Sequence, residues 1–341
     1  MPFVFKSSTP AVSSSNSFKF VNRDNRNTSD TTAISLSTWS TGSGIGISAE
    51  AMTYGNNLYV AVGQVNGIST STNGNTWITR TVGFSRNDWT CITYGNGLYV
   101  ALAAGIGNER VMTSTDAINW TVRNSATPLA DWRGIAYGNG IFVGVAGSGT
   151  SGSPRVMSST DGITWTSRGY TGAFSSVVYG NGVFVAIPYS GTGVVTSTDG
   201  INWTNRTGIN GNWYDITYGN GLFVAVGYNS YNSVMTSPDG ANWTSQNSSS
   251  SRYFWTKVTY GNGLFVAVSG TGVTVSDTTF SGGGIMTSMD GINWTVTSIS
   301  PPIFSVAAGS GSFAASISGN SITSTVVTTA AKSRTFNFKT L

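Results

Sequence analysis

One short motif recurs six times along the chain at nearly constant spacing. It reads Tyr-Gly-Asn, then Gly or Asn, an apolar residue, Phe or Tyr, and Val, and successive copies begin 40, 43, 42, 39 and 42 residues apart. The copies start at Tyr54, Tyr94, Tyr137, Tyr179, Tyr218 and Tyr260. Asn-Gly pairs favour tight turns between antiparallel strands, and a period near 40 residues is typical of a four-stranded propeller blade. The motif therefore predicts an all-β chain built from repeated blades.

A second motif, Ser-x-Asp-Gly-x-x-Trp-Thr, lies between two strand-like runs of each repeat. Asn73 replaces the acid in the first copy, and Ala117 replaces a glycine in another. The aspartates of the motif are Asp116, Asp161, Asp199, Asp239 and Asp290. An Asp side chain in a turn accepts hydrogen bonds from nearby backbone amides, so we predict structural Asp turns. One carboxylate per turn is fewer than tight calcium sites gather, and we expect no metal here.

The tryptophans set the predicted number of blades. All 11 occupy two repeating positions, seven after the Asp turn and four before the first strand of a repeat. Trp39 precedes the first Tyr-Gly-Asn motif, whereas the last repeat, in residues 304–325, has no tryptophan. We therefore predict a seven-bladed β-propeller of four-stranded blades over residues 35–330, closed by the N-terminal strand around Trp39. Such closure removes the exposed sheet edges that promote aggregation.

The charge of the chain is concentrated in its two end segments, residues 1–34 and 331–341. The basic residues there are Lys6, Lys19, Arg23, Arg26, Lys332, Arg334 and Lys339, and the alternating aromatic residues are Phe18, Phe20, Phe336 and Phe338. Residues between the two segments carry almost equal numbers of acids and bases, which argues against a nucleic-acid-binding face. We predict that the end segments anchor the protein to a partner. Disorder, especially in the Ser-rich residues 7–17, is the alternative.

The Asp turn resembles the Asp-box, or BNR repeat, of sialidase-like β-propellers, although here the glycine directly follows the aspartate. The resemblance implies the propeller architecture and, in sialidases, a central site with an arginine triad, a tyrosine nucleophile and acidic partners. That acidic set is hard to assemble, because Glu50 and Glu109 are the only glutamates and only Asp24, Asp30 and Asp277 lie outside the repeated positions. Glycosidases need two carboxylates at a defined separation. We therefore expect no enzymatic activity.

Other catalytic and cofactor sites are also disfavoured. The chain has no histidine, which excludes a His-dependent catalytic triad and the usual zinc sites. Its single cysteine, Cys91, excludes an internal disulfide and is expected to be buried in a strand. The start of the chain lacks a secretory signal, and no apolar stretch approaches the ~20 residues of a membrane helix. We expect no cofactor, no membrane insertion, and folding in a cytoplasm.

The variable loops are the predicted binding surface. In a blade, the first and third turns share one face, while the second loop and the connection between blades share the other. Loops on the second face vary in length and carry Tyr170, Tyr189, Tyr214, Tyr228, Tyr231, Tyr253, Arg86, Glu109, Arg110, Arg155 and Arg252. Tyrosine offers an apolar surface and a hydroxyl at low entropic cost. These residues are predicted to bind a ligand or partner, and ordinary solvated loops are the alternative.

These features together resemble those of a bacteriophage virion protein, such as a capsid decoration or fibre component. Under that interpretation the end segments bind other virion proteins, and the loops bind host surface glycans or a neighbouring subunit, which includes a homo-oligomer. The protein would be assembled in the host cytoplasm and found in the virion. Two alternatives stay open: a free bacterial glycan-binding lectin at the cell surface or outside the cell, and a divergent glycosidase or lyase.

Overall fold

The computed structural model describes residues 47–64, 67–82, 88–105, 108–127, 130–149, 152–228, 233–248, 253–272, 283–299 and 303–317. The chain divides into one unit of residues 34–331 and a second of residues 1–33 with 332–341. All the described residues belong to the first unit. Within them, no helix is long and apolar enough to span a membrane.

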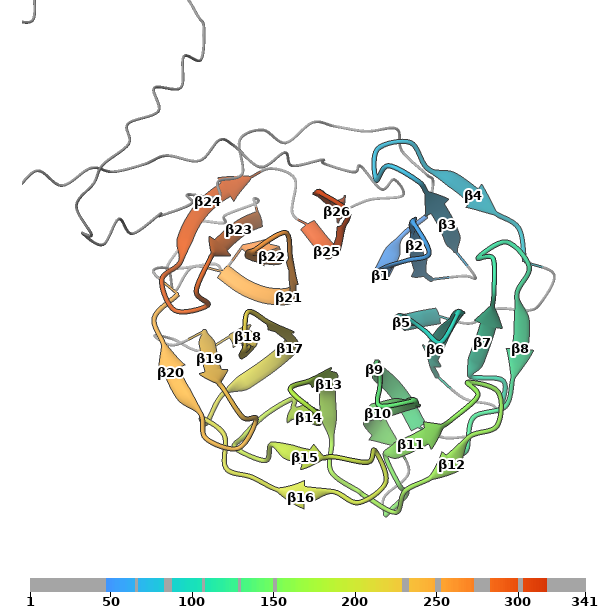
Figure 1. Ribbon diagram of the computed structural model, residues 1–341, viewed down its shortest axis with the longest axis horizontal. Coiled ribbons are helices and arrows are strands. Elements are labelled where there is room, and N and C mark those ends of the chain that lie inside the picture. The colour runs from blue at the N-terminus through green and yellow to red at the C-terminus, as the bar shows by residue number, and fades with distance from the viewer. Residues whose placement is uncertain are drawn as a thin grey trace, which may run out of the picture. The chain divides into compact units, whose positions relative to one another are not determined.

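Six antiparallel four-stranded sheets form blades 1 to 6 in chain order (Figure 1). Blades 1 to 3 comprise β1 Ala49–Gly55, β2 Leu58–Gly63, β3 Ile68–Ser71 and β4 Ile78–Arg80; β5 Asp88–Gly95, β6 Leu98–Ala104, β7 Val111–Ser114 and β8 Thr121–Arg123; β9 Ala130–Gly138, β10 Ile141–Gly149, β11 Val156–Ser159 and β12 Thr166–Ser167. Blades 4 to 6 comprise β13 Phe174–Gly180, β14 Val183–Pro188, β15 Val195–Ser197 and β16 Thr204–Asn205; β17 Asn212–Gly219, β18 Leu222–Tyr228, β19 Val234–Ser237 and β20 Thr244–Gln246; β21 Tyr253–Gly261, β22 Leu264–Gly272, β23 Gly283–Ser288 and β24 Thr295–Ile299.

The last repeat corrects the predicted fold. Its described residues form a sheet of two strands, β25 (Ile303–Gly309) and β26 (Ser312–Ile317), so the propeller has six four-stranded blades and not seven. The last repeat carries neither an Asp turn nor the tryptophan that follows it. The closing strand expected around Trp39 lies outside the described residues.

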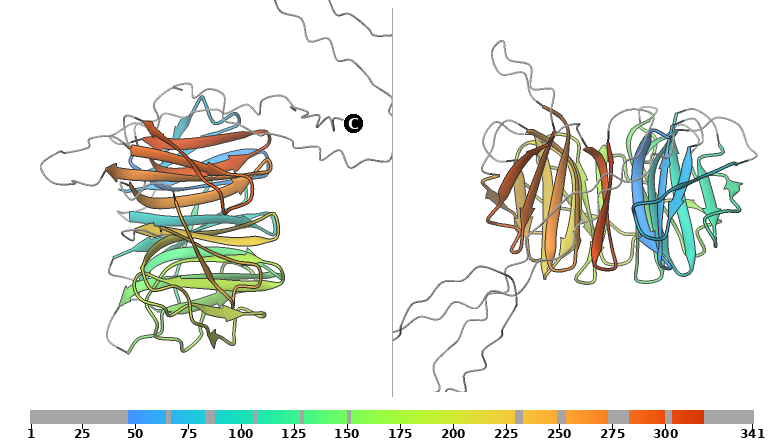
Figure 2. Two further views of the ribbon diagram at one scale, coloured as in Figure 1. Left: turned by 90° about the vertical axis from the view of Figure 1, so that its left-hand side faces the viewer. Right: turned by 90° about the horizontal axis from the view of Figure 1, so that it is seen from above.

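The two-stranded sheet joins the sixth blade to the first. β25 packs against β21 and β22 on one side and against β1 on the other. Its apolar side chains enter both neighbouring cores: Val306 and Phe313 pack with Leu264 of blade 6, while Ala307 and Ala314 pack with Tyr59 of blade 1 and other residues. Figure 1 shows the sheets side by side in a ring, with the first strand of each sheet innermost, and Figure 2 shows the same ring from the side.

The core lies between the blades and is anchored by tryptophans near the start of the first strands. Trp89, Trp132, Trp213 and Trp255 are fully buried. Trp132 of β9, for example, packs against Val100 and Leu102 of the preceding blade. Burying an aromatic side chain of this size contributes several kcal/mol at roughly 25 cal/mol per Å² of apolar area. Each blade is therefore stabilised by its successor.

The Tyr-Gly motif is explained by a close approach between successive blades. A Cβ atom built on Gly95 would lie 2.1 Å from Cγ of Tyr137 in the next blade, and one built on Gly138 would lie 2.0 Å from Cγ of Tyr179. Five successive blade pairs share this arrangement, from blade 1 to blade 6. The tyrosine ring of one blade thus lies directly over the glycine of the blade before it. Any larger residue would collide with that ring.

The two kinds of turn lie on one side of the ring. Nδ2 of Asn139, in the first turn of blade 3, donates to the carbonyl of Thr198, next to Asp199 in the Asp turn of blade 4, at 3.4 Å. Asn181 and Asn220 make equivalent bonds to the Asp turns of the next blades. We call this side the turn face and the opposite side, which carries the variable loops, the loop face.

Candidate functional site

The five Asp-turn carboxylates hold the turn backbone. Oδ1 of Asp199 accepts the amide N–H of Asn202 at 2.8 Å and that of Ile201 at 2.9 Å. These bonds, that from Asn202 most strongly, hold the pKa of the carboxyl well below its usual range. The carboxylate therefore accepts its hydrogen bonds from groups of its own turn. Among the described residues, no group of three or more His, Cys, Asp or Glu side chains lies close enough to hold a metal ion.

A β-bulge occurs at the same place in the first strand of all six blades and in β25. In blade 5, Trp213 pairs with Gly227 and Asp215 pairs with Val226, which leaves Tyr214 as the extra residue. The corresponding extra residues are Glu50, Thr90, Arg133, Ser175, Tyr214, Thr256 and Phe304. Bulges re-aim the side chains beside them and are frequent at functional sites. Here they place a ring of variable residues where each first strand begins, toward the loop face.

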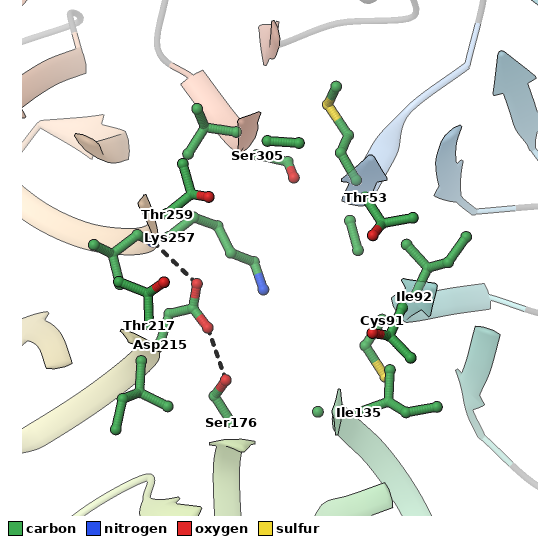
Figure 3. A pocket seen from close by; sticks show the side chains of 18 of the residues that line it. Thr53, Cys91, Ile92, Ile135, Ser176, Asp215, Thr217, Lys257, Thr259 and Ser305 are labelled. Atoms are coloured by element: carbon green, nitrogen blue, oxygen red, sulfur yellow. Dashed lines mark hydrogen bonds between the residues drawn. The ribbon is translucent and has the colours of Figure 1, made fainter. Parts of the chain in front are cut away.

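The residue after each bulge lines the central channel, which holds a cavity of about 320 Å³. These channel-ring residues are Ala51, Cys91, Gly134, Ser176, Asp215, Lys257 and Ser305. Two residues further along four of the strands, the wall carries the side chains of Thr53, Thr93, Thr217 and Thr259. Figure 3 shows this wall from close by, with Lys257 pointing into the channel. The channel therefore combines hydroxyl groups with few charges.

Asp215 links three successive blades. Its Oδ1 accepts the hydroxyl of Ser176 in blade 4 at 2.7 Å, and its Oδ2 accepts the amide N–H of Val258 in blade 6 at 3.0 Å (Figure 3). Both carboxylate oxygens are thus engaged by neighbouring blades. This arrangement fixes the carboxylate against the wall of the channel.

Lys257 is the channel-ring cation. Within the described residues its ammonium group makes no ion pair and no hydrogen bond. Burial raises the pKa of the Cys91 thiol to about 12, and the charges of Lys257 and, to a smaller degree, Arg133 oppose that rise. The positive charges of Lys257 and Arg133 therefore both favour the thiolate form of Cys91 in the channel wall.

Arg133, a bulge residue that also lines the channel, has one acidic neighbour. Its Nη2 lies 2.6 Å from Oδ2 of Asp131, and its Nε donates to the same oxygen at 3.2 Å. The Ser148 hydroxyl donates to that oxygen as well, at 3.2 Å. The Arg133 side chain is 52% exposed, and its Nη1 makes no bond among the described residues. Arg133 can therefore still donate to a ligand.

Three of the predicted loop tyrosines and a phenylalanine form two neighbouring pairs of rings, Tyr189 with Tyr214 and Tyr228 with Phe254, which we call the aromatic cluster. The rings of Tyr189 and Tyr214 meet edge to face at 5.5 Å, with their hydroxyls 3.5 Å apart, and Tyr228 stacks on Phe254 at 3.9 Å. Tyr189 is 51% exposed. Burial, followed by the bond to Tyr189, raises the pKa of Tyr214 to about 12. The cluster therefore offers an accessible aromatic surface.

The other predicted binding residues in the described part of the chain are separate from this cluster. Tyr170 donates its hydroxyl to Oδ1 of Asn205, and the Tyr253 hydroxyl lies 2.7 Å from Oγ of Ser298. Glu109 is exposed and Arg155 is half-buried. Arg110 is 1% exposed, and its Nη1 contacts the carbonyl of Ala103 at 3.5 Å, so in this conformation it cannot reach a ligand.

Several predicted residues lie outside the described part of the chain. They are Arg86, Tyr231 and Arg252 of the loops, Asp277, and the end-segment residues Lys6, Phe18, Lys19, Phe20, Arg23, Arg26, Lys332, Arg334, Phe336, Phe338 and Lys339. The sequence reasoning also missed the channel ring. Neither Asp215 nor Lys257 was singled out as a site residue. The sequence does mark this position: Asp215 and Lys257 each lie three residues before the motif tyrosine of their repeat, where the other repeats carry uncharged residues.

No protein-family model matches the sequence, and no curated protein matches it. Solved structures do match in fold. A streptogramin B lyase aligns with a TM-score of 0.69 and 11% identity over 86% of this chain and 98% of the lyase. Virginiamycin B lyase from Staphylococcus aureus aligns with a TM-score of 0.69 and 11% identity, covering 85% of this chain and 100% of that one. A structure of YCF48 bound to a D1 peptide aligns with a TM-score of 0.61 and 14% identity, covering 85% and 95%.

Identities this low establish the architecture alone, because one fold serves many unrelated functions. The three structures are similar over nearly their whole length to the part of the chain that forms the ring. The sheet order of the described residues and these similarities lead to the same conclusion: the chain is a β-propeller.

Proposed function

We propose that this protein is a non-catalytic recognition protein that binds glycans on the loop face of its propeller. The observation that carries the proposal is the aromatic cluster, an accessible group of rings contributed by three blades next to the channel. Aromatic rings stack on the apolar faces of ligands, and tyrosine hydroxyls hydrogen-bond to polar groups. Loops held by a rigid scaffold are common recognition sites.

The chemistry of the channel supports binding over catalysis. A matching structure is described as a catalytically inactive histidine-to-alanine variant of virginiamycin B lyase with quinupristin, and the present chain has no histidine. Asp215 is the one acid among the described residues that line the channel, and both its oxygens accept bonds from neighbouring blades. A glycosidase would need a second carboxylate across the bond to be cleaved.

A glycan array probed with full-length protein tests the proposal, followed by titration calorimetry on any glycan bound. Replacing Tyr189 by Ala removes one exposed ring and is expected to weaken binding about 2- to 10-fold, which corresponds to the ~0.5–1.5 kcal/mol of an aromatic contact. Ile78→Ala is the matched control, since Ile78 is a 54% exposed apolar side chain on outer strand β4. The absence of any bound glycan, or equal weakening by both variants, would overturn the proposal.

We also propose, from the sequence, that the recognition protein belongs to a bacteriophage particle and that residues 1–34 and 331–341 anchor it there. The support is the basic and aromatic character of these segments beside a nearly neutral repeat region. Deletion of both segments is expected to abolish incorporation into particles while leaving a folded propeller. Normal incorporation of the truncated protein would refute the anchoring role.

A further inference from the structure

We propose that the central channel binds the carboxylate of an acidic sugar, with Lys257 as the main contact and Arg133 as the second cation. The identity of the ligand as a sugar rests on the glycan recognition proposed above. The carboxylate site itself rests on the charges and cavity of the channel, which are independent of the aromatic cluster.

The unpaired charge of Lys257 favours an anion in the channel. Lys257 points into a cavity of about 320 Å³ and has no ion-pair partner among the described residues (Figure 3). Asp215, the one acid of the channel ring, accepts bonds from Ser176 and Val258, and among the described residues it forms no ion pair with Lys257. A cation in a cavity with walls of low dielectric attracts an anion more strongly than one in open solvent.

Arg133 is a second cation that borders the same cavity, and it is already paired with Asp131. Arg133 lines the cavity from blade 3, whereas Lys257 lines it from blade 6. Among the described residues, Nε and Nη2 of Arg133 donate to Oδ2 of Asp131, and Nη1 makes no bond. Guanidinium and ammonium groups both bind carboxylates through charge-assisted hydrogen bonds, which are about twice as strong as neutral ones.

The rest of the wall suits a ligand with several hydroxyl groups. Thr53, Thr93, Thr217 and Thr259 line the cavity from four strands and are partly exposed. A hydroxyl both donates and accepts, so a set of hydroxyls can match the hydroxyls of a sugar ring in many orientations. A peptide terminus offers one amide donor and one carbonyl acceptor per residue, so it matches this wall less fully than a sugar ring with several hydroxyls. These hydroxyls therefore favour a sugar acid over a peptide terminus.

The position of Tyr214 connects the channel with the aromatic cluster. It is the bulge residue immediately before Asp215 of the channel ring, and its ring contacts that of Tyr189. The cavity volume is at the lower end of the ~300–1,000 Å³ typical of ligand sites, which fits one sugar unit. We infer that a terminal sugar acid enters the channel while the next units rest on the cluster.

Glucuronic acid and glucose are suitable probes, because they differ only in whether carbon 6 is a carboxylate or an alcohol. Their affinities for full-length protein are measured by calorimetry or ligand-observed NMR at low and high salt. The proposal predicts that glucuronate binds at least 10-fold more tightly than glucose and that the difference shrinks with salt. Lys257→Met should remove the preference, and Lys257→Arg should restore most of it.

Arg80→Met is the matched control, because it removes one positive charge from outer strand β4 and leaves the channel unchanged. Equal affinity for the two probes, or equal losses in Lys257→Met and Arg80→Met, would overturn the carboxylate site. Equal affinity of acetate, a C-terminal peptide carboxylate and glucuronate would overturn the sugar assignment. Glycan binding that depends on Tyr189 without any preference for acids would refute this inference alone, whereas the absence of all glycan binding would refute the proposed function too.

Discussion

The hydroxyl oxygen of Tyr59 in blade 1 lies 2.7 Å from Oγ of Ser312 in β26, 253 residues further along the chain. The same hydroxyl also donates to the carbonyl of Ser312 at 3.3 Å. Both bonds cross the junction between the first blade and the two-stranded sheet, where Ala307 and Ala314 pack against Trp77 and its neighbours. In the described residues, the two ends of the ring therefore meet through side chains.

Removing the Tyr59 hydroxyl should weaken this junction. Tyr59→Phe is expected to lower the free energy of unfolding by about 1 kcal/mol, the typical net value of one hydrogen bond. Ser312→Ala leaves the bond to the carbonyl and should cost less, and the double variant should cost little more than Tyr59→Phe, which already lacks the bond between the side chains. Urea denaturation measures the effect. Strictly additive losses would show that the two side chains are not coupled.

Adding a methyl group beneath a motif tyrosine should be strongly destabilising. In Gly138→Ala the new Cβ would lie 2.0 Å from Cγ of Tyr179, so the ring or the blade must shift, at an expected cost of about 1–3 kcal/mol or more. Gly193→Ala is the control, since a Cβ added there would have no heavy atom within 4 Å. Thermal unfolding should separate the two variants, and equal melting temperatures would contradict the close approach.

Asp161 should make stability depend on pH in the acid range. The hydrogen bond from the amide of Thr164 is the main cause that lowers the pKa of Asp161 to about 2. Burial raises this pKa, and the hydrogen bond from the amide of Ile163 lowers it further. The stabilising contribution of Asp161 is therefore present above the unfolded-state pKa of ~3.9 and is lost as pH falls toward 2. The free energy of unfolding should accordingly rise with pH across this window.

Variants of Asp161 separate charge from geometry. In the first repeat, Oδ1 of Asn73 accepts the amides of Asn75 and Thr76, both at 2.8 Å, so an amide oxygen can hold the same turn. Asp161→Asn should flatten part of the acid dependence with little loss at pH 7, whereas Asp161→Ala should cost about 1 kcal/mol at pH 7. Denaturation curves at pH 3 and pH 7 test this. Equal curves for both variants would contradict the role of the turn bonds.

Cys91 should be chemically inert in the folded protein even though it lines the channel. It is 6% exposed, and burial raises the pKa of its thiol to about 12, so almost no reactive thiolate exists at pH 8. Labelling with a thiol reagent should be slow in buffer and fast in urea. Native labelling at the rate of a free thiol would show that the thiol is more accessible than its burial in the channel wall implies.

The repeated blades could be predicted because their signals are local. The Tyr-Gly-Asn turn and the Asp turn each lie within a few residues and recur in every full repeat. The blade count failed where those signals end, since the last repeat has no Asp turn to define its third and fourth strands. Counting Trp39 toward that sheet assumed a pairing that sequence spacing alone does not establish.

The candidate site was predicted only in part, because it depends on contacts between blades. The loop tyrosines Tyr189, Tyr214 and Tyr228 were identified from their variable loops, but their meeting with Phe254 follows from blade packing. Lys257 lies within an ordinary strand pattern, and its role depends on the channel that the ring creates. Positions aligned across repeats would have shown that this place in the strand varies from Ala to Asp and Lys.

NMR of protein labelled with ¹³C in its tyrosine rings tests the loop-face account most directly, because tyrosines lie on both faces. The probe is an oligosaccharide ending in glucuronic acid. The account predicts that the signals of Tyr189, Tyr214 and Tyr228 shift on titration. The four motif tyrosines that do not line the cavity, Tyr94, Tyr137, Tyr179 and Tyr218, should stay unchanged. Shifts confined to the motif tyrosines, or no shift in any tyrosine, would contradict it.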